Sequence, residues 1–106
     1  MDSITYAPLD SSPVTFSAEQ VQSIADLAAA LTPITEIAAL IDADEDKLRM
    51  AITDKQSPLR QVYIKAKAET ALAYRKRELE LSQMGSPLAV QQVNIFLRDM
   101  AADEDL

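Results

Sequence analysis

Carboxylates gather in one short stretch near the middle of the chain, at Asp42, Asp44, Glu45 and Asp46. Clustered carboxylate oxygens are the ligands that Mg²⁺ and Ca²⁺ prefer in proteins. A calcium loop also needs acids at alternating positions, a glycine at its sharp turn and a distal bidentate glutamate, and this stretch lacks that pattern. Because an aspartate that precedes a helix also serves as its N-cap, we interpret the run as a solvated turn and predict no metal site.

Other catalytic chemistry has few candidate residues in this composition. The chain has no His and no Cys, which removes the commonest general base, the commonest transition-metal ligand and the thiolate nucleophile. Its single Gly cannot build a glycine-rich phosphate loop, and no Ser or Thr has a His or Cys partner. We therefore predict a protein that is not an enzyme and that binds no cofactor.

Basic residues are concentrated in the second half of the chain, although the formal net charge is −7. Residues 1–56 hold ten acids and three bases, residues 57–100 hold seven bases and four acids, and residues 101–106 add three acids. An anionic partner is therefore expected to meet residues 57–100. Arg75, Lys76 and Arg77 point about 100° apart on a helix, so they form either a solvated face with intrahelical pairs or a phosphate-facing collar in an oligomer.

The elements that would position these side chains begin after an arm at residues 1–16. The arm has two prolines and no helical periodicity, so we expect it to be mobile, although its apolar side chains are able to dock on a neighbouring subunit. Ser17 and Gln20 form a capping box that predicts a helix at about 18–31. Pro33 opens a second helix that reaches Ile41, and after a turn at residues 42–44 a third helix is expected at 45–53.

Two short helices around a polar turn, preceded by a supporting helix, are typical of a helix-turn-helix unit, here residues 17–56. A small Ala stands where the two helices would cross. The exposed face of the third helix would carry Glu45, Asp46, Lys47, Arg49, Met50 and Thr53. The two acids weaken an interpretation as a DNA-reading helix, and a helical bundle with no nucleic-acid role remains open.

One long helix is predicted from Ser57 to Gly85. Ser57 and Pro58 mark its start, Gly85 its end, and no other Gly or Pro interrupts it. Its apolar residues lie along two stripes, which predicts two contact surfaces. One of them would serve self-association, together with Phe96 of the next helix; the residues expected there are Ile64, Ala68, Leu72, Leu79 and Phe96.

Ser86 and Pro87 repeat the helix start of residues 57 and 58, and a final helix with Phe96 as its apolar anchor would complete an antiparallel hairpin over residues 57–100. Residues 101–106 are expected to be an acidic, frayed tail. The predicted fold class is thus all-α, an N-terminal helix-turn-helix unit followed by a long-helix hairpin. No apolar run reaches the ~20 residues that span a bilayer, so the expected location is the cytoplasm, that of a host cell if the protein is viral.

Residues 21–100 resemble a phage terminase small subunit of the helix-turn-helix type. The resemblance rests on ITEIAALIDADEDKL (residues 34–48), SPLRQVYIKAKAETALAYRKRELEL (57–81) and QMGSPLAVQQVNIFLRDM (83–100). It implies a subunit of a bacteriophage that recognises double-stranded DNA for viral genome packaging, assembles as a ring-like homo-oligomer and works with a terminase large subunit. It places Lys47, Arg49, Met50 and Thr53 on the recognition helix, and Lys65 and Lys67 would also meet DNA. Ile41 stands where the family's turn commonly has Gly.

Two other functions remain open at this point. A structural or adaptor protein of the virion would keep the helix-turn-helix shape but bind protein, which the acidic front of the chain favours. A small transcription regulator would be a dimer that reads a two-fold symmetric DNA site.

Overall fold

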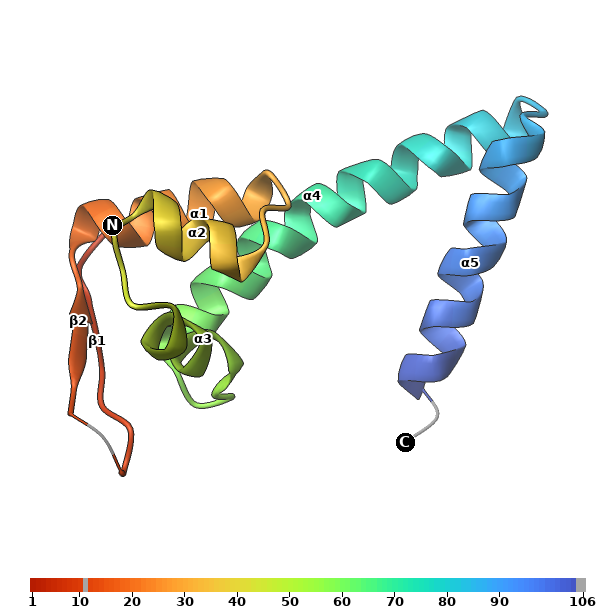
Figure 1. Ribbon diagram of the computed structural model, residues 1–106. Coiled ribbons are helices and arrows are strands. Elements are labelled where there is room, and N and C mark those ends of the chain that lie inside the picture. The colour runs from red at the N-terminus through yellow and green to blue at the C-terminus, as the bar shows by residue number, and fades with distance from the viewer. Residues whose placement is uncertain (11, 105–106) are drawn as a thin grey trace. The chain divides into compact units, whose positions relative to one another are not determined.

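The computed structural model describes residues 1–10 and 12–104 and is mostly helical (Figure 1). The end of the predicted acidic tail, residues 105 and 106, lies outside the described residues. Two short strands, β1 (Ile4–Tyr6) and β2 (Val14–Phe16), precede the helices. The helices are α1 (Ala18–Ala29), α2 (Ile34–Leu40), α3 (Glu45–Thr53), α4 (Pro58–Gln83) and α5 (Pro87–Glu104). The helical content agrees with the predicted class, and the strands depart from it.

The N-terminal arm, which the sequence predicts to be mobile, contains a β-hairpin that the sequence analysis did not anticipate. β1 pairs antiparallel with β2, and Thr5 lies opposite Thr15, with their hydroxyl oxygens 2.8 Å apart. The side chains alternate between the two faces, so that Tyr6 and Phe16 are buried while the threonines are exposed. Ile4 and Val14 pack against the same core. Burial of this apolar face within the chain's own core orders the arm.

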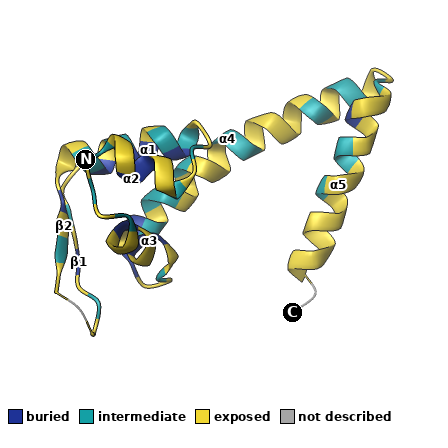
Figure 2. Ribbon diagram, viewed as in Figure 1, coloured by how far each residue is buried: buried dark blue, intermediate teal, exposed yellow. Residues whose placement is uncertain are grey.

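The chain forms two compact units, residues 1–70 and 71–106, which divide inside α4. The core of the first unit is built from apolar residues of the hairpin, of α1, α2 and α3, and of the first turn of α4; its fully buried members include Phe16, Val21, Ile24, Ile37, Leu48, Ile52 and Leu59. Figure 2 shows this burial on α1 and α3. The first turns of α4 therefore belong to the same core as α3.

Side-chain caps fix the starts of the helices as predicted. Ser17 and Gln20 complete a capping box at α1, and the Asp44 carboxylate accepts a hydrogen bond from the Lys47 backbone N–H at 3.0 Å. Ser57 is buried, and its hydroxyl accepts from the Leu59 N–H at 3.2 Å. Gly85 has φ +92°, the left-handed conformation that ends α4. These caps set the register in which each helix turns its apolar side toward the core.

The turn between α2 and α3 needs no glycine at Ile41. Ile41 has φ −102°, and the left-handed residue is Asp42 with φ 55°, a conformation that Asp tolerates better than most residues. Gln20 of α1 holds this turn, because its Nε2 donates to the Ile41 carbonyl at 3.2 Å while its Oε1 accepts from the Ser17 N–H. The supporting helix thus braces the turn directly.

The second unit consists of the end of α4 and all of α5. Tyr74 and Phe96 pack edge to face, with ring centroids 5.9 Å apart, and Ala89 is buried. Most other side chains of α5 are exposed (Figure 2). Within the described residues, none of the helices is both long and apolar enough to cross a bilayer.

Candidate nucleic-acid interface

Four side chains on the outer side of helix α3 are the predicted recognition-helix residues, and we call them the α3 face: Lys47, Arg49, Met50 and Thr53. The exposed Asp46 lies on the same outer side. The inward side of α3 carries Leu48, Ala51 and Ile52, all buried. All four predicted recognition-helix residues are therefore exposed, because the Asp44 cap and the buried side fix the rotation of α3. Lys47 and Arg49, two residues apart, point about 200° apart around the axis and so flank this face from opposite sides.

Arg49 is held in place between α2 and α3. Its Nη2 lies 3.2 Å from the Thr35 hydroxyl oxygen and 3.6 Å from a Glu45 carboxylate oxygen, and the Thr53 hydroxyl donates to the Arg49 carbonyl at 2.8 Å. With Glu45 and Asp46 in the first turn of α3, the outer side of this helix has no net charge. Because the acids Glu45 and Asp46 lie beside the α3 face, the outer side of α3 attracts a polyanion only weakly.

Lys65 and Lys67 do not join the α3 face as a single patch. They stand two residues apart on α4, and so point about 200° apart around its axis. Lys67 Nζ lies 5.9 Å from the centroid of the Tyr63 ring, whereas Lys65 lines two surface pockets of the first unit. The predicted DNA-binding residues therefore fall into three separate places.

A groove beside the turn from α3 to α4 gathers basic side chains that the sequence did not identify as a site. This basic groove is lined by Lys55, Arg60, Gln61, Ile64 and Lys65 and has a volume of about 390 Å³. Arg60 is half-buried, and its Nη1 donates to the Ile52 carbonyl at 3.1 Å. The signal in the sequence is the pair of helical rows Arg60 with Ile64 and Gln61 with Lys65, beside Lys55 in the preceding turn.

The carboxylate of Asp54, the residue before Lys55, accepts two hydrogen bonds from groups outside the basic groove. It accepts from the Gln56 N–H at 2.9 Å and from the Tyr6 hydroxyl at 2.7 Å. These two hydrogen bonds hold the pKa of Asp54 below its usual 3.8, against a smaller opposing effect of desolvation. Donation to Asp54, with burial and the carboxylate's charge, raises the pKa of Tyr6 above 10.0. Asp54 therefore stays ionised and joins the hairpin to the end of α3.

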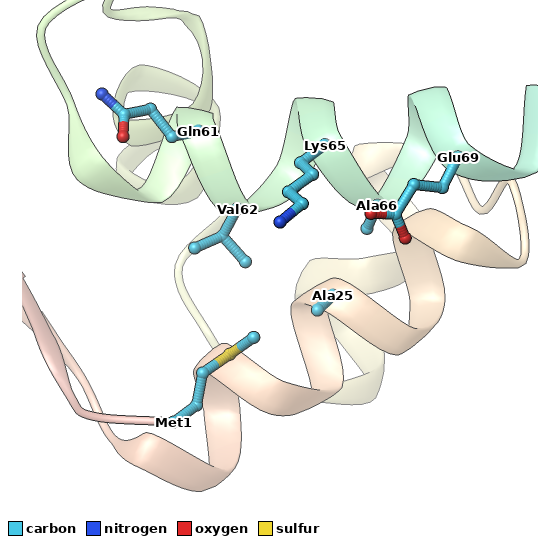
Figure 3. Close-up of a pocket in the computed structure, with 7 residues that line it drawn as sticks. All are labelled: Met1, Ala25, Gln61, Val62, Lys65, Ala66 and Glu69. Carbon is cyan, nitrogen blue, oxygen red and sulfur yellow. The ribbon is translucent and has the colours of Figure 1, made fainter.

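A second pocket of the first unit has a volume of about 470 Å³ and is drawn in Figure 3. Met1, Ala25, Val62 and Ala66 supply apolar walls, and Gln61, Lys65 and Glu69 are its polar lining residues. Figure 3 shows Lys65 and Glu69 extending from α4. This lining offers no nucleophile paired with a base. Over the described part of the chain, no group of three or more acids could hold a metal ion.

The predicted self-association residues are mostly accessible. Ile64 and Ala68 are exposed in the first unit, and Leu72 and Leu79 are 49% and 45% exposed in the second. Phe96 instead is half-buried against Tyr74, and the Arg75 guanidinium carbon lies 5.8 Å from its ring centroid. Arg77 forms an intrahelical ion pair with Glu80 at 3.5 Å, as expected for a solvated face.

Comparisons with known proteins add no relative: no family model, no curated protein and no solved structure matches the chain. Function is therefore inferred from the chain's own residues and geometry.

Proposed function

We propose that the protein is a non-catalytic DNA-recognition subunit for viral genome packaging, similar to a terminase small subunit. In this proposal it forms a ring-like homo-oligomer, meets double-stranded DNA through the α3 face, and works with a large subunit that carries the packaging chemistry. The proposal rests on the resemblance of residues 21–100 together with the geometry of the first unit.

The observation that carries the proposal is the arrangement of α2 and α3. The two short helices contact each other around a tight turn, with Ile37, Ala38 and Leu48 buried, and the outer side of α3 remains free. A recognition helix must pack against its neighbours on one side and expose its other side to enter a DNA groove. Gln20 of α1 braces the turn, as the supporting helix of such a unit does.

Self-association is supported by the second unit. Its apolar residues are largely uncovered: Leu72, Leu79, Leu88, Ile95 and Leu97 are each 40% or more exposed. Exposed apolar residues at this density mark an interaction surface on a helical pair. A homo-oligomer would bury them and would also multiply weak DNA contacts.

The absence of net charge on the outer side of α3 favours a second candidate, an adaptor of the virion that binds protein. Arg49 is already paired with Glu45, and Asp46 balances Lys47. The adaptor would use the same exposed helix, but it would have no affinity for DNA even at low salt.

Binding of labelled duplex DNA across a series of salt concentrations tests the proposal. The double variant Lys47→Ala/Arg49→Ala should weaken binding and flatten its salt dependence. The double variant Lys76→Ala/Arg98→Ala removes the same charge from the second unit and serves as the control. No binding by the wild type at low salt would favour the adaptor, and unchanged binding by the first variant would remove the α3 face from DNA recognition.

A further inference from the structure

The basic groove holds three cationic side chains, Lys55, Arg60 and Lys65, next to the weakly charged outer side of α3. We infer that Lys55, Arg60 and Lys65 hold backbone phosphates of duplex DNA in this groove and thereby set how α3 lies on the duplex. The inference rests on the proposed function, because it assumes that DNA is the partner.

Three of the four polar residues that line the groove are cationic. It combines two ammonium groups and a guanidinium with the side-chain amide of Gln61 and one apolar residue, Ile64. No acid contributes to the lining, and among the described residues no carboxylate oxygen lies within 4.0 Å of these three cations. Three cations without an ion pair in the described part of the chain, around one open groove of a protein with net charge −7, favour an anionic ligand.

Arg60 gives the groove a fixed donor. Its Nη1 donates to the Ile52 carbonyl, so the guanidinium plane is anchored at the last turn of α3. A guanidinium has five N–H donors in a rigid fork, so the remaining donors stay available for phosphate oxygens. Lys55 and Lys65 are exposed and adjust to the ligand as mobile point charges.

The location of the groove favours duplex DNA over an acidic peptide. The groove begins at the end of α3, because Arg60 donates to the carbonyl of Ile52. The residue after Ile52 in the chain is Thr53, the last residue of the α3 face. Contacts to phosphates fix the register and orientation of a protein on the duplex, and side chains on the reading helix then meet the base edges. In this arrangement the cationic groove would contact phosphates, and the neighbouring α3 would contact the base edges.

The test compares duplex binding by the wild type and by the double variant Lys55→Ala/Lys65→Ala in the full chain. Both lysines are exposed, so the variant should keep the wild-type melting temperature. We expect its affinity at low salt to fall roughly tenfold or more, and the slope of log affinity against log salt to decrease by about 1 to 2. The loss should be equal for two duplexes of unrelated sequence, because phosphates carry no sequence information.

The control Lys76→Ala/Arg98→Ala removes the same charge and should stay closer to the wild type. If the wild type binds DNA and the groove variant binds with the same affinity and slope, the inference is overturned while the proposed function stands. If the wild type does not bind DNA, the proposed function fails and the inference with it. A groove variant that loses binding to polyglutamate but not to DNA would assign the groove to an acidic protein segment and overturn the inference.

Discussion

The Tyr6 hydroxyl donates a hydrogen bond to the Asp54 carboxylate at 2.7 Å, which joins residues 48 positions apart in the chain. Tyr6 belongs to β1, and Asp54 is the C-cap residue of α3. The contact therefore attaches the N-terminal hairpin to the end of the helix that carries the proposed DNA face. It also orients the ionised Asp54 carboxylate toward the Tyr6 hydroxyl, while the Gln56 N–H donates to its other oxygen.

Replacing Tyr6 by Phe should loosen the hairpin without unfolding the helical core. The ring would still fill its buried site, but Asp54 would lose one of its two hydrogen-bond donors. We expect the melting temperature to fall by a few degrees and the amide protons of β1 and β2 to exchange faster, while those of α1 change little. The control is Thr5→Val on the exposed side of the same strand, because it removes only the contact with Thr15. Equal exchange rates in the Tyr6 variant and the wild type would show that the hairpin does not depend on Asp54.

The stability gained from this pair should depend on pH at both ends of the range. The pKa of Asp54 is lowered, so its contribution is present above 3.8 and is lost as the pH falls through the lower folded value. The pKa of Tyr6 is raised, so its contribution is present below 10.0 and is lost as the pH rises through the higher folded value. The difference in unfolding free energy between the wild type and Tyr6→Phe should be steady between these limits and shrink outside them. Urea titrations at a series of pH values measure it, and a constant difference down to strongly acid pH would contradict the assignment.

Leu31 stands in the left-handed backbone region with φ 60°, which a branched side chain rarely adopts. Its side chain is 55% exposed, so little packing compensates for the backbone strain. Leu31→Gly should raise the free energy of unfolding by up to about 1 kcal/mol. Leu40→Gly is the matched control, since Leu40 is an exposed leucine in helical conformation, and it should lower stability by about 1 kcal/mol. A destabilised Leu31→Gly protein would mean that the Leu31 side chain matters more than its backbone.

Substitutions of buried and exposed leucines in α4 distinguish effects on folding from effects on assembly. Leu59 is fully buried in the first unit, so Leu59→Ala should cost about 2 to 5 kcal/mol of stability. Leu72 is half exposed in the second unit, so Leu72→Ser together with Leu79→Ser should leave the helical circular dichroism of the chain nearly unchanged but reduce its native mass. A double variant that keeps the wild-type mass would place the assembly surface elsewhere.

Local signals predicted the helices well. Helix ends are marked by interactions and backbone conformations that involve only three or four neighbouring residues, so a single sequence reveals them. The residues that mark them here are Ser17 with Gln20, Asp44, Ser57 with Pro58, and Gly85. The hairpin escaped detection because its strands have only three residues each, too few to establish an alternating pattern. Its apolar side chains are recognisable only once a core exists to receive them.

Only part of the candidate site could be predicted from the sequence, because some of it depends on contacts between elements far apart in the chain. The α3 face follows from the Asp44 cap and from helical periodicity, both of which are local. The basic groove depends on the contact of Arg60 in α4 with the Ile52 carbonyl in α3, which joins separate elements. Phe96 was predicted both as the anchor of the hairpin and as an assembly residue, and the structure places it against Tyr74, where it is half-buried.

Sedimentation velocity of the native protein, with and without a fluorescently labelled short duplex, tests the central claim most directly. The proposed function predicts that the protein alone sediments as a homo-oligomer of several copies and that the duplex migrates with it, less so as salt is raised. A monomer that leaves the duplex sedimenting freely at low salt would contradict it.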